Sequence, residues 1–289
     1  MNRPIDALLQ TFIDMIAAGT PPWRQPWARG GTAQLPLRAD GEPFTGSNSW
    51  ILAFAGAEEG VLSPYWFTFR QALAIGAPVR KGAKGRHVIL FKTRTVEAEG
   101  EQSADETRTL RFLKTYVVFN GDQLDGLPDA FRGSPVDGGL RGQMRDAVID
   151  AIPAEIVYGG DKAFYLPAVD RIHMPKPERF ESFDEACSTL LHEMAHWTGH
   201  GSRLAREFGR RCGDEAYAFE ELVAELSAAL LSLHLQTPPA TLGSHASYLA
   251  SWVKVLKHRP GALIEASAHA QRAVDFLLAF SRAEGALAA

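Results

Sequence analysis

The residues best suited to chemistry lie in the segment 182–200, S-F-D-E-A-C-S-T-L-L-H-E-M-A-H-W-T-G-H. Apolar residues recur there at helical spacing, which predicts an amphipathic helix with one buried face. His192 and His196 are four residues apart, so both imidazoles lie on the same side of that helix and can bind one Zn²⁺. Glu193 is then placed to take a proton from a water molecule at the metal. This pattern favours a metal-dependent hydrolase over an ordinary helix with two surface histidines.

A catalytic zinc site of this kind needs a third protein ligand and one open position. A second amphipathic helix, predicted over residues 217–233, carries three glutamates near its start. At about 100° per residue, Glu221 and Glu225 lie on the flank of its apolar stripe, whereas Glu220 falls on the solvent side. We therefore predict Glu221 as the third ligand and Glu225 as the residue that orients a ligating histidine. The three-histidine version of the motif is excluded, because its third position is Ser202.

Both ends of the first helix carry further signals. Ser182 and Glu185 have the spacing of a capping box, in which each side chain accepts a hydrogen bond from the other residue's amide. Gly199 is expected to take the left-handed conformation that closes a helix. Tyr217 and His200 are candidates either for stabilising an oxyanion or for purely structural roles.

The composition is that of a soluble globular protein, with 289 residues of which 46% are hydrophobic and 22% are charged. No stretch approaches the ~20 apolar residues needed to span a bilayer. Residues 1–19 show an amphipathic helix pattern rather than a signal peptide. The two cysteines do not suggest a disulfide framework, and Cys187 falls on the buried face of the predicted metal-site helix. We therefore expect a cytoplasmic protein with no membrane partner.

Charge is sorted along the first half of the chain. Residues 66–94 contain seven basic residues and no acidic one, whereas residues 97–106 contain five acidic residues and no basic one. Glycines punctuate the basic loop at 80–86, so backbone amides and cations can approach phosphates closely. Aromatic residues interleave with it, and single-stranded nucleic acid requires cations along its backbone and rings under its bases. The predicted DNA contacts are Arg70, Arg80, Lys81, Lys84, Arg86, Trp23, Trp27, Trp50 and Trp66.

Each of these features also has a simpler explanation. A basic patch is commonly a solvated face of a protein. The prolines around Trp23 and Trp27 fit a lid over a small core as well as they fit a stacking surface. The acidic run at 97–106 is most simply the solvated tip of a hairpin.

The remaining segments predict an α+β fold. Helices are expected near residues 4–18, 45–54, 70–75, 140–152, 242–256 and 263–278. Strands are expected at residues 65–69, 87–91, 110–119, 155–158, 163–166 and 170–175. The second and third of these strands should form one hairpin, and the fourth and fifth should form another across a glycine-containing turn.

Two further expectations concern the organisation of the chain. Pro175 ends the strand at 170–175, so the proline requires either an edge position for that strand or a place at the strand's end, and an edge strand there could pair with an extended peptide. Residues 120–142 are rich in Gly, Pro and Asp and are interpreted as a linker. The predicted domains are 1–132 and 133–289.

Several motifs, in the same order along almost the whole chain, resemble the plasmid-borne antirestriction family ArdC, which is related to the N-terminal regions of TraC-type primases. The first half contributes P-W-R-Q-P-W, F-T-G-S-N-S-W-I-L, W-F-T-F-R-Q-A-L-A-I-G-A-P-V-R-K-G-A-K-G and F-N-G-D-Q-L-D-G-L. The second half contributes D-R-I-H-M-P, H-E-M-A-H-W-T-G-H-G-S-R-L and Y-A-F-E-E-L-V-A-E-L. One departure is Phe44, where the family pattern leads us to expect a tyrosine.

The resemblance implies a first domain that binds single-stranded DNA and a zincin-like metallopeptidase domain with a short sheet and the H-E-x-x-H helix. It places the metal on His192, His196 and Glu221 and the general base on Glu193. The implied metal is Zn²⁺, with Mn²⁺ or another divalent ion as the alternative. Such proteins protect incoming plasmid DNA from host restriction during conjugation. The protein substrate is not identified, and a component of a host restriction system is one candidate.

Two rival hypotheses remain open from the sequence. In the first, the chain is a DNA-protecting protein whose metal site is structural or catalytically silent. In the second, it is a metallopeptidase whose basic loop recognises an acidic protein partner, and it does not bind oligonucleotides.

Overall fold

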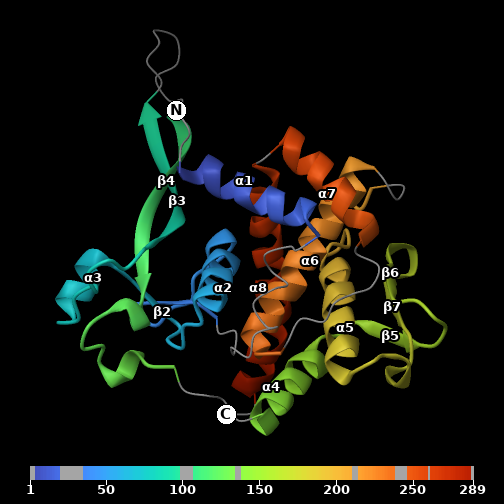
Figure 1. Cartoon of the computed structure of the whole chain (residues 1–289). Helices are drawn as coiled ribbons and strands as arrows, with labels where there is room; N and C mark the ends of the chain where they lie inside the picture. Colours follow the sequence, from blue (N-terminus) through green and yellow to red (C-terminus); the bar gives the residue numbers. More distant parts are fainter. Residues whose placement is uncertain are drawn as a thin grey trace.

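The structure is a computed structural model that describes residues 4–19, 35–97, 107–133, 138–209, 214–237, 246–259 and 261–287. A four-stranded sheet lies on one side of the molecule, a three-stranded sheet lies on the other, and helices fill the space between them (Figure 1). The predicted α+β fold class is therefore confirmed.

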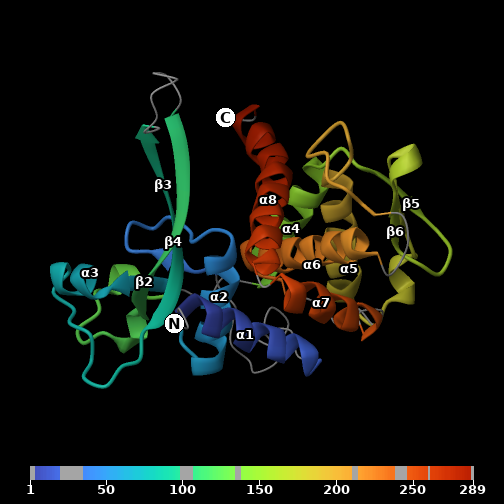
Figure 2. The ribbon, with the colours of Figure 1, turned by 90° about the horizontal axis from the view of Figure 1, so that it is seen from above.

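The larger sheet has the strand order β1-β2-β4-β3. Its strands are β1 (Leu37–Arg38), β2 (Tyr65–Thr68), β3 (Arg86–Glu97) and β4 (Thr107–Asn120). Strands β3 and β4 form the predicted antiparallel hairpin, in register from Arg86 opposite Val118 to Glu97 opposite Thr107. The hairpin extends well past the other strands of its sheet (Figure 2). Residues 98–106, which hold most of the acidic run, lie outside the described residues.

Helix α2 (Ser47–Glu59) joins this sheet to the second half of the chain. Asn48 donates to the carbonyl of Ile89 and accepts from its amide, both at 2.8 Å, so its side chain pairs with the edge of β3. The indole nitrogen of Trp50 donates to Ser267 Oγ in the last helix at 3.0 Å. The F-T-G-S-N-S-W segment is therefore a structural connection between the two halves.

The linker predicted over residues 120–142 is wrong for residues 120–131, which belong to the folded structure. Residues 120–131 form two short 3₁₀ turns, η1 (Gly121–Gln123) and η2 (Asp129–Phe131), and they contribute side chains to a small core beside the sheet. Asn120 is fully buried and accepts a hydrogen bond from the Asp122 amide at 2.9 Å. Gly, Pro and Asp serve here to build hydrogen-bonded turns, which is why their composition resembles that of a linker.

The smaller sheet has the order β5-β7-β6, with β5 (Glu155–Tyr158) parallel to β7 (Arg171–Met174) and β6 (Phe164–Leu166) antiparallel to it. The predicted second hairpin is wrong, because β7 lies between its two strands. Strand β7 is central rather than at an edge, so of the two positions that Pro175 allows, the structure has the strand end. Pro175 follows the last paired residue, so it removes no donor from the ladder. The edges are β5 and β6, and β6 and β7 contact α5 (Phe183–Thr198).

The other helices are α1 (Pro4–Ala17), α3 (Phe69–Ala74), α4 (Gly138–Ala151), α6 (Glu215–Leu235), α7 (Ala246–His258) and α8 (Ala262–Leu287). One continuous core includes residues of α1, α2, α5, α6, α7 and α8, so it runs across the boundary predicted at residue 133. Helix α1 packs against α7, which ties the start of the chain to its last third. Among the described residues, no helix is long and apolar enough to cross a lipid bilayer.

Candidate metal centre and nucleic-acid interface

Helix α5 carries the two histidines, and both of its ends are held by specific contacts. Ser182 accepts from the Glu185 amide at 3.1 Å as predicted, but the Glu185 carboxylate accepts from the amide of Glu181 instead of that of Ser182. Gly199 has φ −77°, so the predicted left-handed conformation is wrong. A Cβ atom at Gly199 would lie 2.8 Å from Phe208 Cζ. Close packing, rather than a positive φ, therefore requires the glycine.

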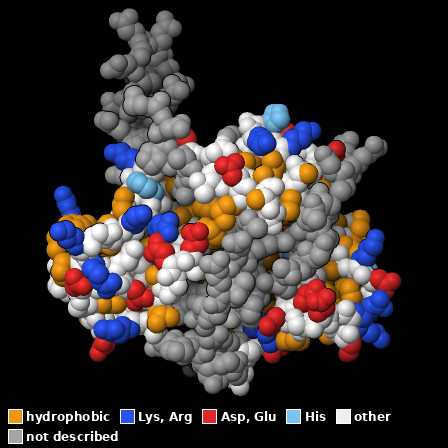
Figure 3. All heavy atoms as spheres, in the orientation of Figure 1, with side chains coloured by type: hydrophobic (Ala, Val, Ile, Leu, Met, Phe, Trp, Pro, Cys, Tyr) orange, Lys and Arg blue, Asp and Glu red, His pale blue; other side chains and the backbone are white. Residues whose placement is uncertain are grey.

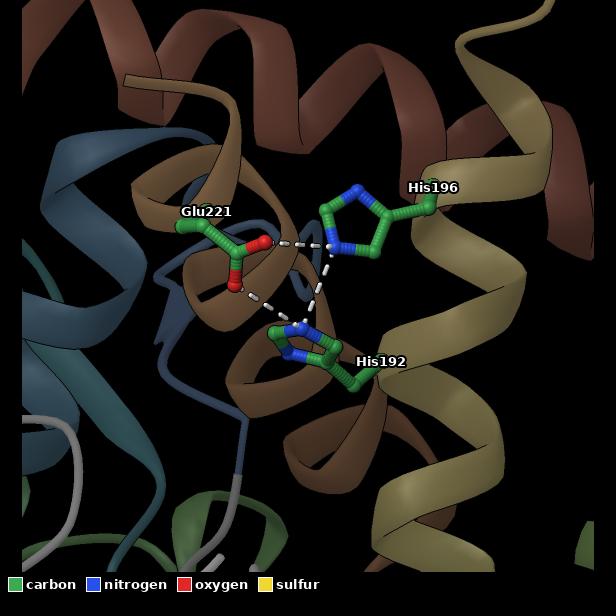
Figure 4. A group of neighbouring side chains, drawn as sticks. All are labelled: His192, His196 and Glu221. Atoms are coloured by element: carbon green, nitrogen blue, oxygen red, sulfur yellow. Dashed lines mark hydrogen bonds and ion pairs between the residues drawn. The ribbon is translucent and has the colours of Figure 1, made fainter. Parts of the chain in front are cut away.

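Three side chains from α5 and α6 point at one another inside the molecule (Figure 4). The Nε2 atoms of His192 and His196 are 3.2 Å apart, and each lies 3.6 Å from an oxygen of Glu221. All three residues are buried. Ligand atoms bound tetrahedrally at about 2.0–2.1 Å are about 3.3 Å from one another. The spacing and types of these three donors therefore fit a single divalent ion.

This cluster gathers negative charge in the interior. Four buried glutamates surround the two histidines: Glu193, Glu220, Glu221 and Glu225. Burial by itself raises the pKa of the Glu221 carboxyl, but the hydrogen bond with His192 and the charge of His196 outweigh it and lower that pKa to about 2. Buried carboxylates are costly to keep ionised unless they are paired or coordinate a metal. A divalent cation suits the charge of the site as well as its donor atoms.

Glu193 faces the same site from α5. Burial raises the pKa of its carboxyl, and the neighbouring His192 and His196 oppose that rise. The backbone amide of Tyr165, in the edge strand β6, hydrogen bonds to the Glu193 carboxylate. A raised pKa brings a carboxylate closer to the range in which a general base works near neutral pH.

Glu220 is placed differently from the prediction. It is 2% exposed rather than solvent-facing, and its Oε1 lies 3.1 Å from His196 Nδ1. Arg206 donates two hydrogen bonds of 2.8 Å to the same carboxylate. The prediction assumed one buried stripe, whereas α6 is buried on almost every side. The apolar composition of residues 222–235 was the signal that this helix is enclosed.

The other residues predicted near the metal have distinct surroundings. Glu225 Oε2 lies 3.6 Å from His192 Nδ1, the imidazole nitrogen that faces away from His196. This placement suits the orienting role that we predicted for Glu225. Tyr217 hydrogen bonds to Glu221, whereas His200 lies partly exposed just beyond the end of α5.

An arginine network fastens the smaller sheet to the C-terminal end of α5. Arg203 donates to the two oxygens of Asp170 at 2.5 and 2.9 Å and to the carbonyl of Trp197 at 2.6 Å. Its guanidinium lies 3.9 Å from the centre of the Trp197 ring. The Tyr165 hydroxyl also donates to Asp170, at 2.7 Å. These contacts stabilise the packing of the smaller sheet against the end of α5.

Replacing Asp170 by Asn will lower the free energy of unfolding by about 1–2 kcal/mol at neutral pH, because a charged hydrogen bond to Arg203 is lost from a carboxylate that is 38% exposed. Asn tolerates the φ of 53° at this position, so no backbone strain is added. The hydrogen bond from Arg203 lowers the pKa of Asp170 to about 2. Its stabilisation is therefore complete above the ordinary pKa of about 3.9 and is lost as pH falls through about 2.

Urea unfolding of both proteins between pH 7 and pH 2.5 measures this effect. The difference in unfolding free energy between the wild type and Asp170→Asn will be constant above about pH 5 and will shrink below about pH 4. A difference that stayed the same over the whole range would contradict the ionic contribution of Asp170.

Three of the predicted DNA-contacting cations share one surface, formed by α3 and the loop before β3. Arg70, Lys81 and Lys84 are exposed, and none of them forms an ion pair with another described residue. Figure 3 shows Lys and Arg side chains, interspersed with Asp and Glu, on the side of the molecule where α3 lies. Exposed cations without acidic partners attract phosphate groups.

Arg80 and Arg86 differ from these three because acidic residues already partly neutralise them. Arg80 Nε lies 3.2 Å from Asp125 Oδ1, and Arg86 Nη2 lies 2.5 Å from Glu59 Oε1. Both arginines therefore help to hold the basic loop in place. They are left with less free charge for a phosphate than their neighbours have.

The tryptophans require a correction. Trp50 and Trp66 are each 2% exposed, so the prediction that they stack on bases is wrong. Trp50 packs edge-on against Phe12 with ring centroids 4.6 Å apart, and Trp66 belongs to the core beneath the larger sheet. Large aromatic side chains bury much of the apolar area in a core, and a ring buried in this way is not available to a ligand. Trp23 and Trp27 lie outside the described residues.

Phe69 is the exposed ring that the sequence interpretation missed. It is 53% exposed and lies edge-on to Phe119, with ring centroids 6.5 Å apart. Gly85 of the basic loop packs against the same Phe119, since a Cβ atom there would lie 3.0 Å from its ring. Phe119 therefore holds α3 and the basic loop side by side. The missed signal is the capping box of Thr68 and Gln71, which begins a helix at Phe69 where we expected a strand.

Two family models match separate parts of the chain. The N-terminal domain of the anti-restriction factor ArdC matches residues 4–119, and a zincin-like metallopeptidase model matches residues 143–269. The crystal structure of the metal-free antirestriction ArdC protein from plasmid R388 is similar, with 38% identity, a TM-score of 0.81 and coverage of 97% of this chain and 98% of that one. Its Mn(II)-bound structure gives the same identity and coverage with a TM-score of 0.79. These similarities support a divalent-metal centre in this fold.

Curated relatives extend the comparison. A DNA primase TraC from Escherichia coli is 35% identical over an alignment 296 positions long, which covers 96% of this chain and 27% of the primase. A second TraC from Escherichia coli is 34% identical and is covered over 20% of its length. The chain thus spans only about a fifth to a quarter of the length of these primases. The uncharacterized protein y4eC of Sinorhizobium fredii is 32% identical over an alignment 280 positions long, which covers 92% of this chain and 88% of that protein.

Proposed function

The chain belongs to the ArdC family of antirestriction proteins, and we propose that it binds single-stranded DNA and hydrolyses peptide bonds at a divalent-metal centre. DNA binding belongs to a domain over residues 1–132 and the peptidase to a domain over residues 133–289. Zn²⁺ is the proposed metal, and Mn²⁺ is the alternative that the Mn(II)-bound R388 relative supports. Together these activities protect plasmid DNA that enters the cytoplasm by conjugation from host restriction.

One observation carries the peptidase proposal. Two imidazole nitrogens and one carboxylate converge at 3.2–3.6 Å from one another, and Glu193 lies beside them. The proposed ligands are His192, His196 and Glu221. Catalytic zinc sites typically use three protein ligands, the number proposed here, whereas structural sites use four.

A divalent ion held by these residues would supply Lewis-acid chemistry, which would polarise a carbonyl oxygen and make water a nucleophile near neutral pH. Glu193 accepts the proton of the attacking water and then donates it to the leaving amine. Glu225 holds the imidazole of His192 from its Nδ1 side. Tyr217 holds the carboxylate of Glu221 by a hydrogen bond, so both ligands are fixed before any metal arrives.

Strand β6 offers a place for the substrate backbone. It is an edge of the smaller sheet, it contacts α5, and its Tyr165 amide hydrogen bonds to Glu193. An extended peptide that adds to this edge would lie beside the general base, held by main-chain hydrogen bonds. The proposed substrate class is therefore a protein segment without regular structure, and a component of a host restriction system is our candidate.

The exposed surface around α3 supports the DNA-binding proposal. Arg70, Lys81 and Lys84 supply positive charge without acidic partners among the described residues, and Phe69 supplies an exposed ring beside Phe119 of β4. Cations for the backbone and a ring for a base are the elements that bind single strands without sequence preference.

Replacing Glu221 by Ala will weaken metal binding by more than about 100-fold, because it removes one of three proposed ligands. Titration of metal-free protein with Zn²⁺ and Mn²⁺, in competition with a chromophoric chelator, measures this affinity. Glu215→Ala is the matched control, since Glu215 is an exposed glutamate at the start of the same helix. Equal metal affinities for the two variants would contradict the assignment of Glu221.

A further inference from the structure

A buried arginine reaches the candidate metal centre from the loop that follows α5. Arg206 lies in residues 199–209, which fold back over the C-terminal end of α5, and its side chain is 3% exposed. Its guanidinium donates to the carbonyl of Ala195 at 2.7 Å and to the hydroxyl of Thr198 at 2.8 Å. It also donates to both oxygens of Glu220, each at 2.8 Å. The arginine thus joins the end of α5 to α6.

Glu220 continues this connection to a proposed metal ligand. Its Oε1 lies 3.1 Å from His196 Nδ1. An ionised carboxylate can only accept, so Nδ1 carries the proton of a neutral His196 and Nε2 keeps its lone pair. Nε2 is the nitrogen that faces His192 and Glu221 (Figure 4). Glu220 therefore fixes which nitrogen can bind a metal and where it points.

The arginine is required to keep Glu220 in that position. A guanidinium that bonds both oxygens of a carboxylate fixes its plane, which a single ammonium group does not. Arg206 is itself anchored to Ala195, the residue that precedes His196. The guanidinium packs closely against the end of α5, because a Cβ atom at Gly199 would lie 2.9 Å from Arg206 Nη2.

We propose that Arg206 and Glu220 form a positioning pair that sets the affinity and coordination geometry of a metal bound through His196. This inference rests on the proposed metal site. Neither residue is one of the proposed metal ligands, and both act through the orientation of one imidazole. Carboxylates that hydrogen bond to a ligating histidine typically change metal affinity by about 10- to 100-fold.

The test compares the full-length wild type with Arg206→Lys and with the double variant Arg206→Met/Glu220→Met. Chelator competition measures Zn²⁺ affinity, the absorption spectrum of bound Co²⁺ measures coordination geometry, and thermal unfolding of the metal-free proteins shows whether each is folded. We expect the Kd for Zn²⁺ to rise by about 10- to 100-fold and the Co²⁺ bands to shift in both variants. The double variant leaves no unpaired buried charge, so it remains informative if the single variant does not fold.

Arg203→Lys is the matched control, because Arg203 pairs with Asp170 and Trp197 at the same helix end. It should lower thermal stability and leave Zn²⁺ affinity and the Co²⁺ spectrum unchanged. An equal loss of affinity in this control overturns the positioning role, and so do folded Arg206 variants with wild-type affinity and spectrum. A wild type that binds neither ion would instead remove the proposed metal site itself.

Discussion

Replacing Glu193 by Gln will leave the metal bound and reduce peptide hydrolysis by about 10²- to 10⁴-fold, the usual contribution of a general base. Gln has nearly the shape of Glu, and its amide oxygen can still accept the hydrogen bond from the Tyr165 amide, but it cannot take a proton from water. Hydrolysis of an unfolded protein substrate, measured with the metal content of the same sample, gives both quantities. Glu185→Gln is the matched control, since Glu185 lies on the same helix and bonds to the Glu181 amide instead.

The same variant separates peptidase action from DNA protection. If proteolysis is required, Glu193→Gln will also fail to protect a conjugating plasmid in a restricting recipient. If the metal site is structural or catalytically silent, protection will be unchanged while the protein still binds metal. Full hydrolysis by the variant would remove Glu193 as the base and leave the metal-ligand proposal standing.

Replacing Arg70, Lys81 and Lys84 together by Ala will weaken binding to a single-stranded oligonucleotide by about 100-fold at ~0.1 M salt. The reason is counterion release, because each lost phosphate contact lowers the slope of log affinity against log salt by about 0.7 for single strands. The triple variant should therefore lose about 2 from that slope. Fluorescence anisotropy of a labelled oligonucleotide at several salt concentrations measures both the affinity and the slope.

Phe69→Ala tests the ring on the same surface by a different signature. Loss of one stacked base costs about 1–3 kcal/mol and leaves the salt slope unchanged, because no charge is removed.

The matched control for the triple variant replaces three exposed lysines of the second half: Lys162, Lys176 and Lys257. Binding that is insensitive to salt, or that is equally strong for a duplex, would contradict the single-strand proposal. An absence of binding would favour an acidic protein partner for the basic loop.

Local sequence determined the elements that carry the chemistry. Spacing of four residues placed His192 and His196 on one side of α5, and the periodicity of residues 217–233 identified the helix that brings Glu221 toward them. Alternation and turn residues identified β3 and β4 and their pairing. These features depend on contacts between residues that are near in the sequence, so the periods of the helix and the strand are enough to predict them.

Tertiary packing decided what the periodicity leaves open. Glu220 became a buried partner of His196 and Arg206 because α6 is enclosed by other helices, whereas a helical wheel considers one helix alone. Trp50 and Trp66 are buried in the core, so the proposed stacking role falls to Phe69, which is exposed at the start of α3. The order of the smaller sheet also depended on distant contacts, since β7 enters between two strands that are neighbours in the sequence.

The sequence by itself therefore determined the family, the α+β class and the residue types available at the candidate site. Only the folded structure decided which carboxylate contacts which imidazole nitrogen and which aromatic ring remains at the surface. The physical reason is that burial and hydrogen-bond partners are properties of several segments packed together, and no single segment contains them.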